Sequence, residues 1–416
     1  MKTAIIIGAG DRGRKIYGRF AERHPHEINI VGVAEPNKVI RNAMEEDHNI
    51  EPSNVYENYE TILSREKFAD AAIVTTLDRL HYEPVIKAIE LGYDILLEKP
   101  ISPELKECVE IIDKAKKHNV TITVCHVLRY TSFWSKIKEI VESGEIGEVA
   151  SIQLNENVEY MHMSHSFVRG NWGNKEKSSP MILQKSCHDM DIISYIIGKN
   201  CERVSSYGSL MHFNEKNKPE GAPKRCLKGC PVADSCPYHA GEYYLGEGRG
   251  WAGKFTTELT DENIIEALWT TDYGKCVYQS DNDVVDHQVV NMEFEGGATA
   301  MFSMCGFTRE QTRITQIMGT KGEIRGNMAD NSISVYDFST GHEKVINLKK
   351  TVGGHGGGDE KLMREFIKSM DTKEGMISSV EKSLESHLMA FAAEQSRLEQ
   401  GRSIELSELR HAQYIR

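Results

Sequence analysis

The hydrophobic positions in the first third of the chain fall into short apolar runs separated by amphipathic stretches. Apolar runs rich in β-branched residues are typical of buried parallel strands, and here they occupy residues 2–7, 28–34, 69–75, 93–97 and 120–124. The stretches between them carry apolar residues at helical spacing, for example Leu105, Val109 and Ile112. Strands that alternate with helices predict a doubly wound, parallel α/β sheet, which binds ligands beyond the carboxyl ends of its strands.

The pattern changes near residue 125. A helix is predicted at 132–143, and longer runs with strand alternation follow at 148–158, 284–294, 298–304, 313–318, 332–337 and 343–348. They predict an α+β domain with a large, mostly antiparallel sheet, whose second face is free to line a cleft or a subunit interface. A chain of 416 residues is longer than the chains that usually fold around a single hydrophobic core. We therefore predict two domains, residues 1–125 and 126–416.

The first apolar run leads directly into a glycine-rich turn. Its sequence is Gly8-Ala9-Gly10-Asp11-Arg12-Gly13, and a helical pattern starts at Arg14. Gly8 would form the tight turn, Gly10 would let the backbone approach a pyrophosphate, and Gly13 would let helix and strand pack closely. The phosphates would bind the free N–H groups at the start of the helix. Such a turn also occurs in loops that only need a positive φ, so the surrounding residues decide its meaning.

Glu35 supplies the second half of this pattern. It ends the second apolar run and lies 22 residues beyond Gly13, close to the spacing of the acid that accepts the ribose hydroxyls of a dinucleotide. The alternative is a solvated loop carboxylate. A carboxylate here would repel a 2′-phosphate, so the sequence favours NAD, while the nearby Arg12, Lys38 and Arg41 keep NADP possible. We predict a dinucleotide-binding Rossmann domain.

Further motifs follow the predicted strands and give the chain a family resemblance. They are Thr75-Thr76, His81-Tyr82-Glu83-Pro84, Glu98-Lys99-Pro100 and Gly319-Thr320-Lys321-Gly322. Together with the glycine turn and Glu35 they resemble the glucose–fructose oxidoreductase and inositol dehydrogenase (Gfo/Idh/MocA) family over nearly the whole chain. The resemblance implies that Lys99 lies near the nicotinamide and the substrate hydroxyl, after a peptide that is often cis before the proline. Thr75, Thr76, His81 and Glu98 are further candidates for contact with the cofactor.

The resemblance also implies a catalytic histidine at the start of a helix in the second domain. His188 matches it, but the family's aspartate four residues earlier is Gln184 in this chain. Glutamine cannot take a proton or stabilise an imidazolium by its charge. Lys185, Asp189 and Asp191 are the candidates to replace the acid, and of these we include Lys185 among the catalytic candidates.

The family's crossover between domains resembles residues 125–130, which places His126 and Arg129 at the cleft. The implied function is that of an NAD-dependent oxidoreductase acting on the CH–OH group of a polyol, sugar or sugar derivative. One alternative is an NAD-dependent glycosidase that uses transient oxidation. Another is a non-catalytic, dinucleotide-binding regulatory protein, which Gln184 in place of the acid would favour.

Three cysteines form a separate motif in an insertion near residues 220–240. Cys226, Cys230 and Cys236 are spaced C-x3-C-x5-C among glycine and proline residues. Three thiolates of a structural zinc site could come from this loop, with His239, Cys276 or Cys187 as the fourth ligand. The alternative is that these thiols only pack, or form an adventitious disulfide.

Composition narrows the possible partners. The net charge is −12, which argues against nucleic acid or an anionic membrane as a partner. No apolar stretch approaches the roughly 20 residues needed to span a bilayer, and the first residues lack the regions of a signal peptide. We therefore expect a cytoplasmic protein with mostly reduced cysteines, a small-molecule substrate, and a homo-oligomer, dimer or tetramer, formed through the second domain's sheet.

Overall fold

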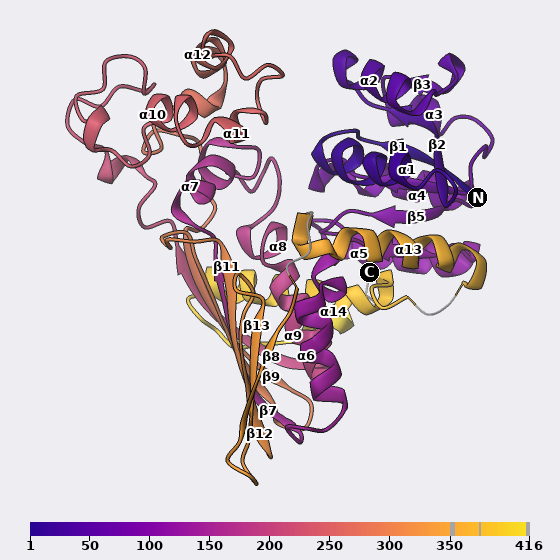
Figure 1. The fold of residues 1–416 in the computed structure, drawn as a ribbon, viewed down its shortest axis with the longest axis vertical. Coiled ribbons are helices and arrows are strands. Elements are labelled where there is room, and N and C mark those ends of the chain that lie inside the picture. Colours follow the sequence, from indigo (N-terminus) through magenta and orange to yellow (C-terminus); the bar gives the residue numbers. More distant parts are fainter. Residues whose placement is uncertain (350–353, 374–375, 413–416) are drawn as a thin grey trace.

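The computed structural model describes residues 1–349, 354–373 and 376–412. Its strands form a parallel sheet of six strands and a mostly antiparallel sheet of nine. Figure 1 places the parallel sheet at the upper right and the long strands of the other sheet below and to the left. The predicted fold class, an α/β Rossmann domain followed by an α+β domain with a large sheet, is confirmed.

The parallel sheet has the strand order β3-β2-β1-β4-β5-β6, the order of a dinucleotide-binding domain. Its strands are β1 (Lys2–Ile7), β2 (Ile28–Ala34), β3 (Val55–Tyr56), β4 (Ala71–Val74), β5 (Asp94–Leu97) and β6 (Ile122–Val124). Its helices are α1 (Arg19–Arg23), α2 (Lys38–His48), α3 (Tyr59–Ile62), α4 (Tyr82–Glu90) and α5 (Leu105–His118). Every residue of β4 and β5 is buried, as the continuous apolar runs predicted.

Local signals fix the helix ends. The Asn37 side chain accepts hydrogen bonds from the backbone N–H groups of Val39 and Ile40, and so caps the start of α2. Asn49, with φ 49°, takes the left-handed conformation just after the same helix. A polar residue before the apolar stripe and an asparagine after it therefore define α2.

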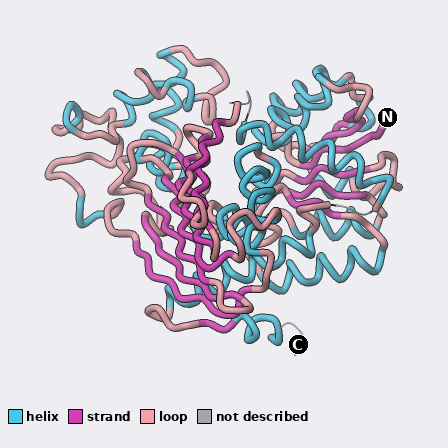
Figure 2. The backbone as a smooth tube through the Cα atoms, turned by 60° about the horizontal axis from the view of Figure 1, so that its bottom comes forward, coloured by secondary structure: helices cyan, strands magenta, loops and turns pink. Residues whose placement is uncertain are grey.

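The last third of the chain returns to the parallel sheet. Helix α13 (Gly358–Thr372) contributes Leu362, Met363 and Phe366 to the core that also contains Tyr17 and Phe20. Helix α14 (Val380–Leu398) packs against α5 and also against the large sheet. The helices that cover the parallel sheet therefore come from both ends of the chain, and Figure 1 shows the orange α13 beside the helices of the first domain. Figure 2 shows helices packed beside the strands of the molecule.

The large sheet has the order β14-β13-β12-β11-β7-β10-β9-β8-β15. Its strands are β7 (Val149–Asn157), β8 (Cys201–Ser209), β9 (His287–Phe294), β10 (Thr299–Cys305), β11 (Thr312–Gly319), β12 (Gly322–Asn327), β13 (Ser332–Asp337), β14 (Glu343–Asn347) and β15 (Ile404–Glu405). Its neighbouring strands are antiparallel except for the pair β7 and β10. Helices α6 (Ser132–Glu142), α9 (Cys187–Ile197) and α14 cover one face (Figure 1).

The cysteine motif lies in a long excursion between β8 and β9, residues 210–286. This excursion, which we call the insertion, is larger than the sequence indicated and contains helices of its own. They are α10 (Ala240–Leu245), α11 (Arg249–Ala252) and α12 (Asp261–Thr270). The remaining helices of the second domain are α7 (Tyr160–His162), α8 (Met181–Gln184) and α15 (Leu406–Ala412). No helix within the described residues is long and apolar enough to cross a membrane.

Candidate active site

The glycine turn begins at the carboxyl end of β1, and two of its glycines are required by close contacts. Gly8 has φ +85°, and a Cβ added there would lie 3.0 Å from the backbone of Thr75. A Cβ on Gly13 would lie 2.3 Å from the Gly8 carbonyl oxygen, so only glycine fits. Around Gly10, in contrast, a Cβ would meet no atom within 4 Å. The turn is therefore tightly packed at Gly8 and Gly13 but open at Gly10, where a pyrophosphate could approach the backbone.

Glu35 lies directly beside this turn. Its side chain is buried, and its two carboxylate oxygens accept hydrogen bonds from the backbone N–H groups of Ala9 (2.7 Å) and Asn37 (2.9 Å). The Arg41 guanidinium donates to the backbone carbonyls of Glu35 and Pro36. The carboxylate is thus held at the end of β2, within the glycine-turn region, and is not a solvated loop residue.

Arg12 connects the turn to β5 and to α13. It donates to the carboxylate of Glu98 (2.5 Å), to the carboxylate of Asp359 (2.8 Å) and to the Tyr17 hydroxyl (2.5 Å). Burial raises the pKa of Glu98, but the charges of Arg12 and Lys99 outweigh this and hold it below its ordinary value. The guanidinium of Arg12 therefore points into the protein and is occupied by two carboxylates.

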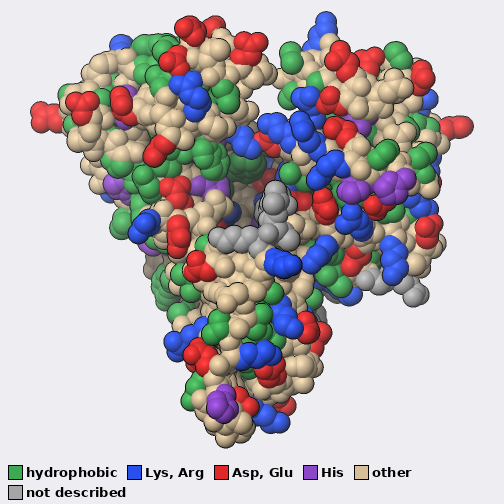
Figure 3. Space-filling model, in the orientation of Figure 1, with side chains coloured by type: hydrophobic (Ala, Val, Ile, Leu, Met, Phe, Trp, Pro, Cys, Tyr) green, Lys and Arg blue, Asp and Glu red, His purple; other side chains and the backbone are tan. Residues whose placement is uncertain are grey.

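Asp11, at the tip of the turn, contacts the insertion. It pairs with Lys15 at 2.6 Å and with Lys254, which follows α11. Partial burial raises the pKa of Asp11, but the two lysines outweigh this and lower it. The insertion therefore reaches the cofactor side of the parallel sheet, and Figure 3 shows the surface hollowed between the two.

The loops after β4 and β5 are connected by His81. Its fully buried ring lies with Nδ1 2.7 Å from the Pro100 carbonyl oxygen and Nε2 3.1 Å from the Thr76 carbonyl oxygen. The Thr75 hydroxyl donates to the Gly8 carbonyl, which fastens the same loop to the glycine turn. His81 thus holds two loops of the site together, while its contact with a cofactor stays a prediction.

Lys99 connects the two domains. The Lys99–Pro100 peptide is cis, and the Lys99 ammonium donates to the backbone carbonyl of Gln184 at 2.7 Å. The Gln184 amide instead donates to the Trp172 carbonyl, and its oxygen accepts from Ser178. The residue in the place of the family's acid therefore meets Lys99 only through its main chain.

His188 stands beside a group of buried histidines. Its ring centroid lies 6.1 Å from that of His126, which in turn lies 5.9 Å from that of His387. Burial lowers the pKa of His126 well below its ordinary value, and the charges of Arg129 and Lys99 lower it further. Burial likewise lowers the pKa of His387 to about 3. His126 and His387 are therefore neutral at pH near 7, and the ring that neighbours His188 is an uncharged imidazole.

The candidates to replace the family's acid have other partners. Arg129, which the resemblance placed at the cleft, is buried and binds both oxygens of Asp191, at 2.6 and 2.7 Å. Arg313 makes the same kind of bidentate contact with Asp189, with hydrogen bonds of 2.7 and 3.3 Å. Both aspartates are thus bound by an arginine.

Lys185 belongs to the same buried ionic group. Its ammonium lies 3.1 Å from the carboxylate of Glu156, which Arg313 also contacts at 2.6 Å. Burial and the Glu156 charge raise the pKa of Asp189 to about 6, although Arg313 lowers it. Lys185, Glu156, Arg313 and Asp189 form a chain of alternating charges, which we call the ionic quartet. It joins β7 and β11 to the start of α9.

Two family models match nearly the whole chain. The one described as "Oxidoreductase family, NAD-binding Rossmann fold" matches residues 2–126, and "Oxidoreductase family, C-terminal alpha/beta domain" matches residues 138–406. The chain belongs to the Gfo/Idh/MocA family. It is therefore an oxidoreductase with an NAD-binding domain, and the resemblance stated from its motifs is confirmed.

The curated relatives include proteins with several activities. YteT of Bacillus subtilis, named as an oxidoreductase, is 26% identical over 317 residues, which are 73% of each chain. The 2,7-anhydro-N-acetylneuraminate hydratase of Mediterraneibacter gnavus is 29% identical, over 52% of this chain and 55% of its own. Inositol 2-dehydrogenase of Corynebacterium glutamicum is 24% identical, over 48% of this chain and 55% of its own. The chain thus matches about half the length of the last two.

Solved structures share the fold over almost the full length. Scyllo-inositol dehydrogenase of Lactobacillus casei, solved with NAD(H) and scyllo-inositol, has a TM-score of 0.68 at 16% identity and covers 98% of this chain and 99% of its own. An Agrobacterium radiobacter oxidoreductase, solved with NAD+, L-tartaric acid and magnesium, gives 0.68 at 13% with the same coverage. At identities this low, the likeness to these two structures shows a shared fold alone.

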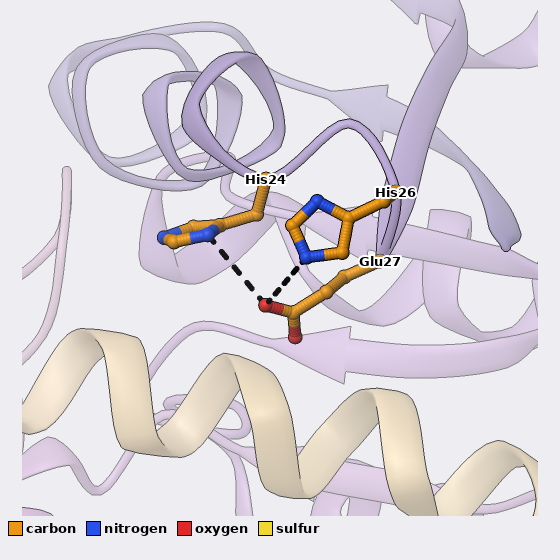
Figure 4. A group of neighbouring side chains, drawn as sticks. All are labelled: His24, His26 and Glu27. Carbon is orange, nitrogen blue, oxygen red and sulfur yellow. Dashed lines mark ion pairs between the residues drawn. The ribbon is translucent and has the colours of Figure 1, made fainter.

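The metal candidates lie away from this site. Within the described residues the one compact group of ligand type is His24, His26 and Glu27, shown in Figure 4. It precedes β2, at the opposite edge of the sheet from the glycine turn, and Glu27 also pairs with Arg364 at 3.4 Å. A carboxylate already paired with a cation is a poor metal ligand, so this group carries no site.

Several residues around the site had no signal in the sequence. Glu156 and Arg313 lie on strands whose alternation is otherwise ordinary, and His387 lies on the last long helix. The backbone N–H of Ile101 donates to His387, which anchors the chain just after Lys99. A charged residue at an inward position of a strand was the only available hint, and the partners of Arg313 lie more than 100 residues away.

Proposed function

We propose that this oxidoreductase transfers a hydride between NAD and the CH–OH carbon of a polyol, sugar or sugar derivative. The observation that carries the proposal is the position of Lys99. It follows the carboxyl end of β5, on the side of the sheet that holds the glycine turn, and its ammonium contacts the segment that contains Gln184 and His188. One cationic group thus links the nucleotide side and the second domain. The inositol 2-dehydrogenase relative supports a polyol-type substrate.

The residues present fit the dinucleotide. Gly10 faces open space, Glu35 stands at the end of β2, and both share the carboxyl edge of the sheet with Lys99. When bound, NAD accepts or returns the hydride. Lys99 would orient the substrate hydroxyl, and Lys99 and His188 would share the movement of its proton.

Two other functions remain to be distinguished. The hydratase relative favours a reaction in which oxidation is transient, as in an NAD-dependent glycosidase. A non-catalytic regulatory role is suggested by Gln184, whose amide cannot replace an acid. Net NADH formation separates the dehydrogenase from both, because transient oxidation returns the cofactor to its oxidised form and a regulatory protein produces no NADH.

The test is a screen of polyols, sugars and sugar acids with NAD and with NADP, followed by the absorbance of the reduced cofactor. Net reduction by any of these substrates supports the dehydrogenase. Product formation at constant cofactor redox state would replace it with the transient-oxidation mechanism. No turnover by a chain that binds NAD would favour the regulatory role.

Glu35 should set the cofactor preference. We expect tighter binding of NADH than of NADPH, because a buried carboxylate at the end of β2 repels a 2′-phosphate and Arg12 is already occupied by Glu98 and Asp359. Glu35→Gln should narrow the preference by about tenfold, equivalent to about 1.4 kcal/mol. Titration followed by nucleotide fluorescence measures both constants.

Glutamine is the informative replacement, because it removes the charge but keeps an oxygen to accept the hydrogen bond from Ala9. Glu35→Ala should narrow the preference too, but it also removes that support from the turn and should weaken both cofactors. Tighter binding of NADPH by the unmodified protein would contradict the assignment.

We also propose that the open face of the large sheet joins subunits. Large apolar side chains project from this face on six strands, with exposed fractions of 40% or more. They are Tyr207, Val289, Met301, Ile314, Tyr336 and Val345. Tyr207 and Val289 are paired across β8 and β9, so Val289→Glu would place a charge among the apolar side chains of this face. Light scattering should show an oligomer for the native chain and a smaller species for the variant, while an unchanged mass would contradict this surface.

A further inference from the structure

Four cysteines line one small cavity at the base of the insertion. Cys226, Cys230 and Cys236 come from the motif, and Cys276 comes from the segment that leads back to the sheet. Two backbone hydrogen bonds bring the segments together, from Cys226 N–H to the Gly274 carbonyl and from Cys276 N–H to the Lys224 carbonyl. All four thiols are free of disulfides.

A buried arginine points at the same cavity. Arg169 is 3% exposed; it donates to the carbonyls of Lys275 (2.8 Å) and Tyr238 (2.6 Å) and lies 3.6 Å from the Cys226 sulfur. Among the described residues no carboxylate forms an ion pair with Arg169, and its Nη1 makes no hydrogen bond. A buried cation without a counter-charge is strongly unfavourable. Thiolates in this cavity would supply the missing negative charge.

The contacts also identify the fourth ligand among the three candidates. His239 is occupied, because its Nε2 lies 3.1 Å from the Cys226 carbonyl oxygen and its Nδ1 accepts from the Glu242 N–H. Cys187 lies at the start of α9 and does not line the cavity. Cys276 does line it, and completes a set of four sulfur ligands.

We propose that Cys226, Cys230, Cys236 and Cys276 bind a metal centre through four thiolates, with Arg169 offsetting its charge. No three of these four described sulfurs all lie within 4.8 Å of one another, whereas a single tetrahedral zinc brings its sulfurs to about 3.8 Å. An iron–sulfur cluster also takes four cysteines, around a larger core. A single zinc would therefore require the sulfurs to move closer, whereas the ligand sulfurs of a cluster stand farther apart.

The centre would be structural. It would join the cysteine loop to the segment around Cys276 and so stabilise the insertion. The insertion contains Lys254, which contacts Asp11 of the glycine turn. Loss of the metal should therefore loosen the insertion and expose the cofactor side of the cleft, without removing any group that we assign to hydride or proton transfer.

The first experiment measures metal in the full-length chain, purified without chelator under anaerobic conditions. We expect either about one zinc per chain, or iron together with a matching amount of acid-labile sulfide and visible charge-transfer absorption. Either result supports the four-thiolate centre and identifies the metal. The absence of both, together with failure of the apo-protein to take up zinc or iron and sulfide, overturns it.

Matched serine variants then test the ligand set. Cys276→Ser and Cys226→Ser should each reduce the bound metal by about tenfold or more. Cys305→Ser on β10 and Cys187→Ser, both outside the cavity, should retain it. Full metal in Cys276→Ser, or its loss in Cys187→Ser, would refute the assignment.

Alkylation of the native chain does not depend on how the variants fold. The four cavity thiols should resist the reagent together and become reactive together after the metal is removed, while the reactivity of Cys305 stays the same. Independent reaction of the four thiols, with no effect of metal removal, would contradict a shared centre.

Discussion

Replacing Lys99 by alanine should lower kcat by about a hundredfold or more, the usual contribution of a positioned acid or base. Its ammonium is held at the junction of the two domains by the Gln184 carbonyl, on the edge of the sheet that carries the glycine turn. The affinity for NADH should change far less, because Glu35 and the turn stay intact. Steady-state turnover and NADH titration on the same preparation separate the two quantities.

Two further variants make this result specific. His188→Ala should lower kcat to a similar extent, since it removes the other proposed proton-handling group. Gln184→Ala should cost much less, because the Gln184 amide contacts Trp172 and Ser178, and only its backbone carbonyl meets Lys99. Near-native kcat in Lys99→Ala would remove the lysine from the mechanism.

Replacing Arg313 by methionine should lower the free energy of unfolding by about 3–5 kcal/mol, the cost of breaking a buried ion pair from one side. Arg313 stands between Glu156 and Asp189, which are both fully buried. Without it, Lys185 alone faces two carboxylates. Urea denaturation measures the change through the transition midpoint, provided that the m-value is unaltered.

Arg23→Met is the matched control. Arg23 lies at the end of α1 and pairs with Glu360 at 3.0 Å, but its side chain is 59% exposed. Its loss should cost less than about 1 kcal/mol, as for surface ion pairs in general. Equal effects of the two substitutions would show that the ionic quartet does not stabilise the fold as a buried network.

The deficit of Arg313→Met should also depend on pH. The pKa of Asp189 is already raised to about 6 by burial, and removing Arg313 raises it further. A carboxyl whose pKa is higher in the folded than in the unfolded state binds protons on folding, so it stabilises the fold as the pH falls. The deficit should therefore be smaller at about pH 5 than at about pH 8. A deficit that grows towards low pH would contradict this account.

The sequence was a good guide wherever one short stretch carries the whole signal. Five of the six parallel strands are mainly apolar runs, so their existence and order of appearance could be predicted. Gly8 and Gly13 could be identified because the glycine spacing of a dinucleotide turn is local, and the structure adds that neighbouring backbone leaves no room for a Cβ at either position. Strands β3, β8, β12 and β15 were missed, since they are polar, glycine-containing or very short.

The remaining features depend on contacts between distant residues. Arg313 meets Asp189 across 124 positions, Arg12 meets Asp359 across 347, and Cys276 reaches the cavity of a motif that ends 40 residues earlier. Hydrophobic periodicity tells which side of an element is buried, but not which element will cover it. The sequence by itself therefore determined the nucleotide-binding fold, the family and the residues at the strand ends. Only the tertiary structure decided which charges and thiols face one another, because that depends on how the two sheets and the insertion pack.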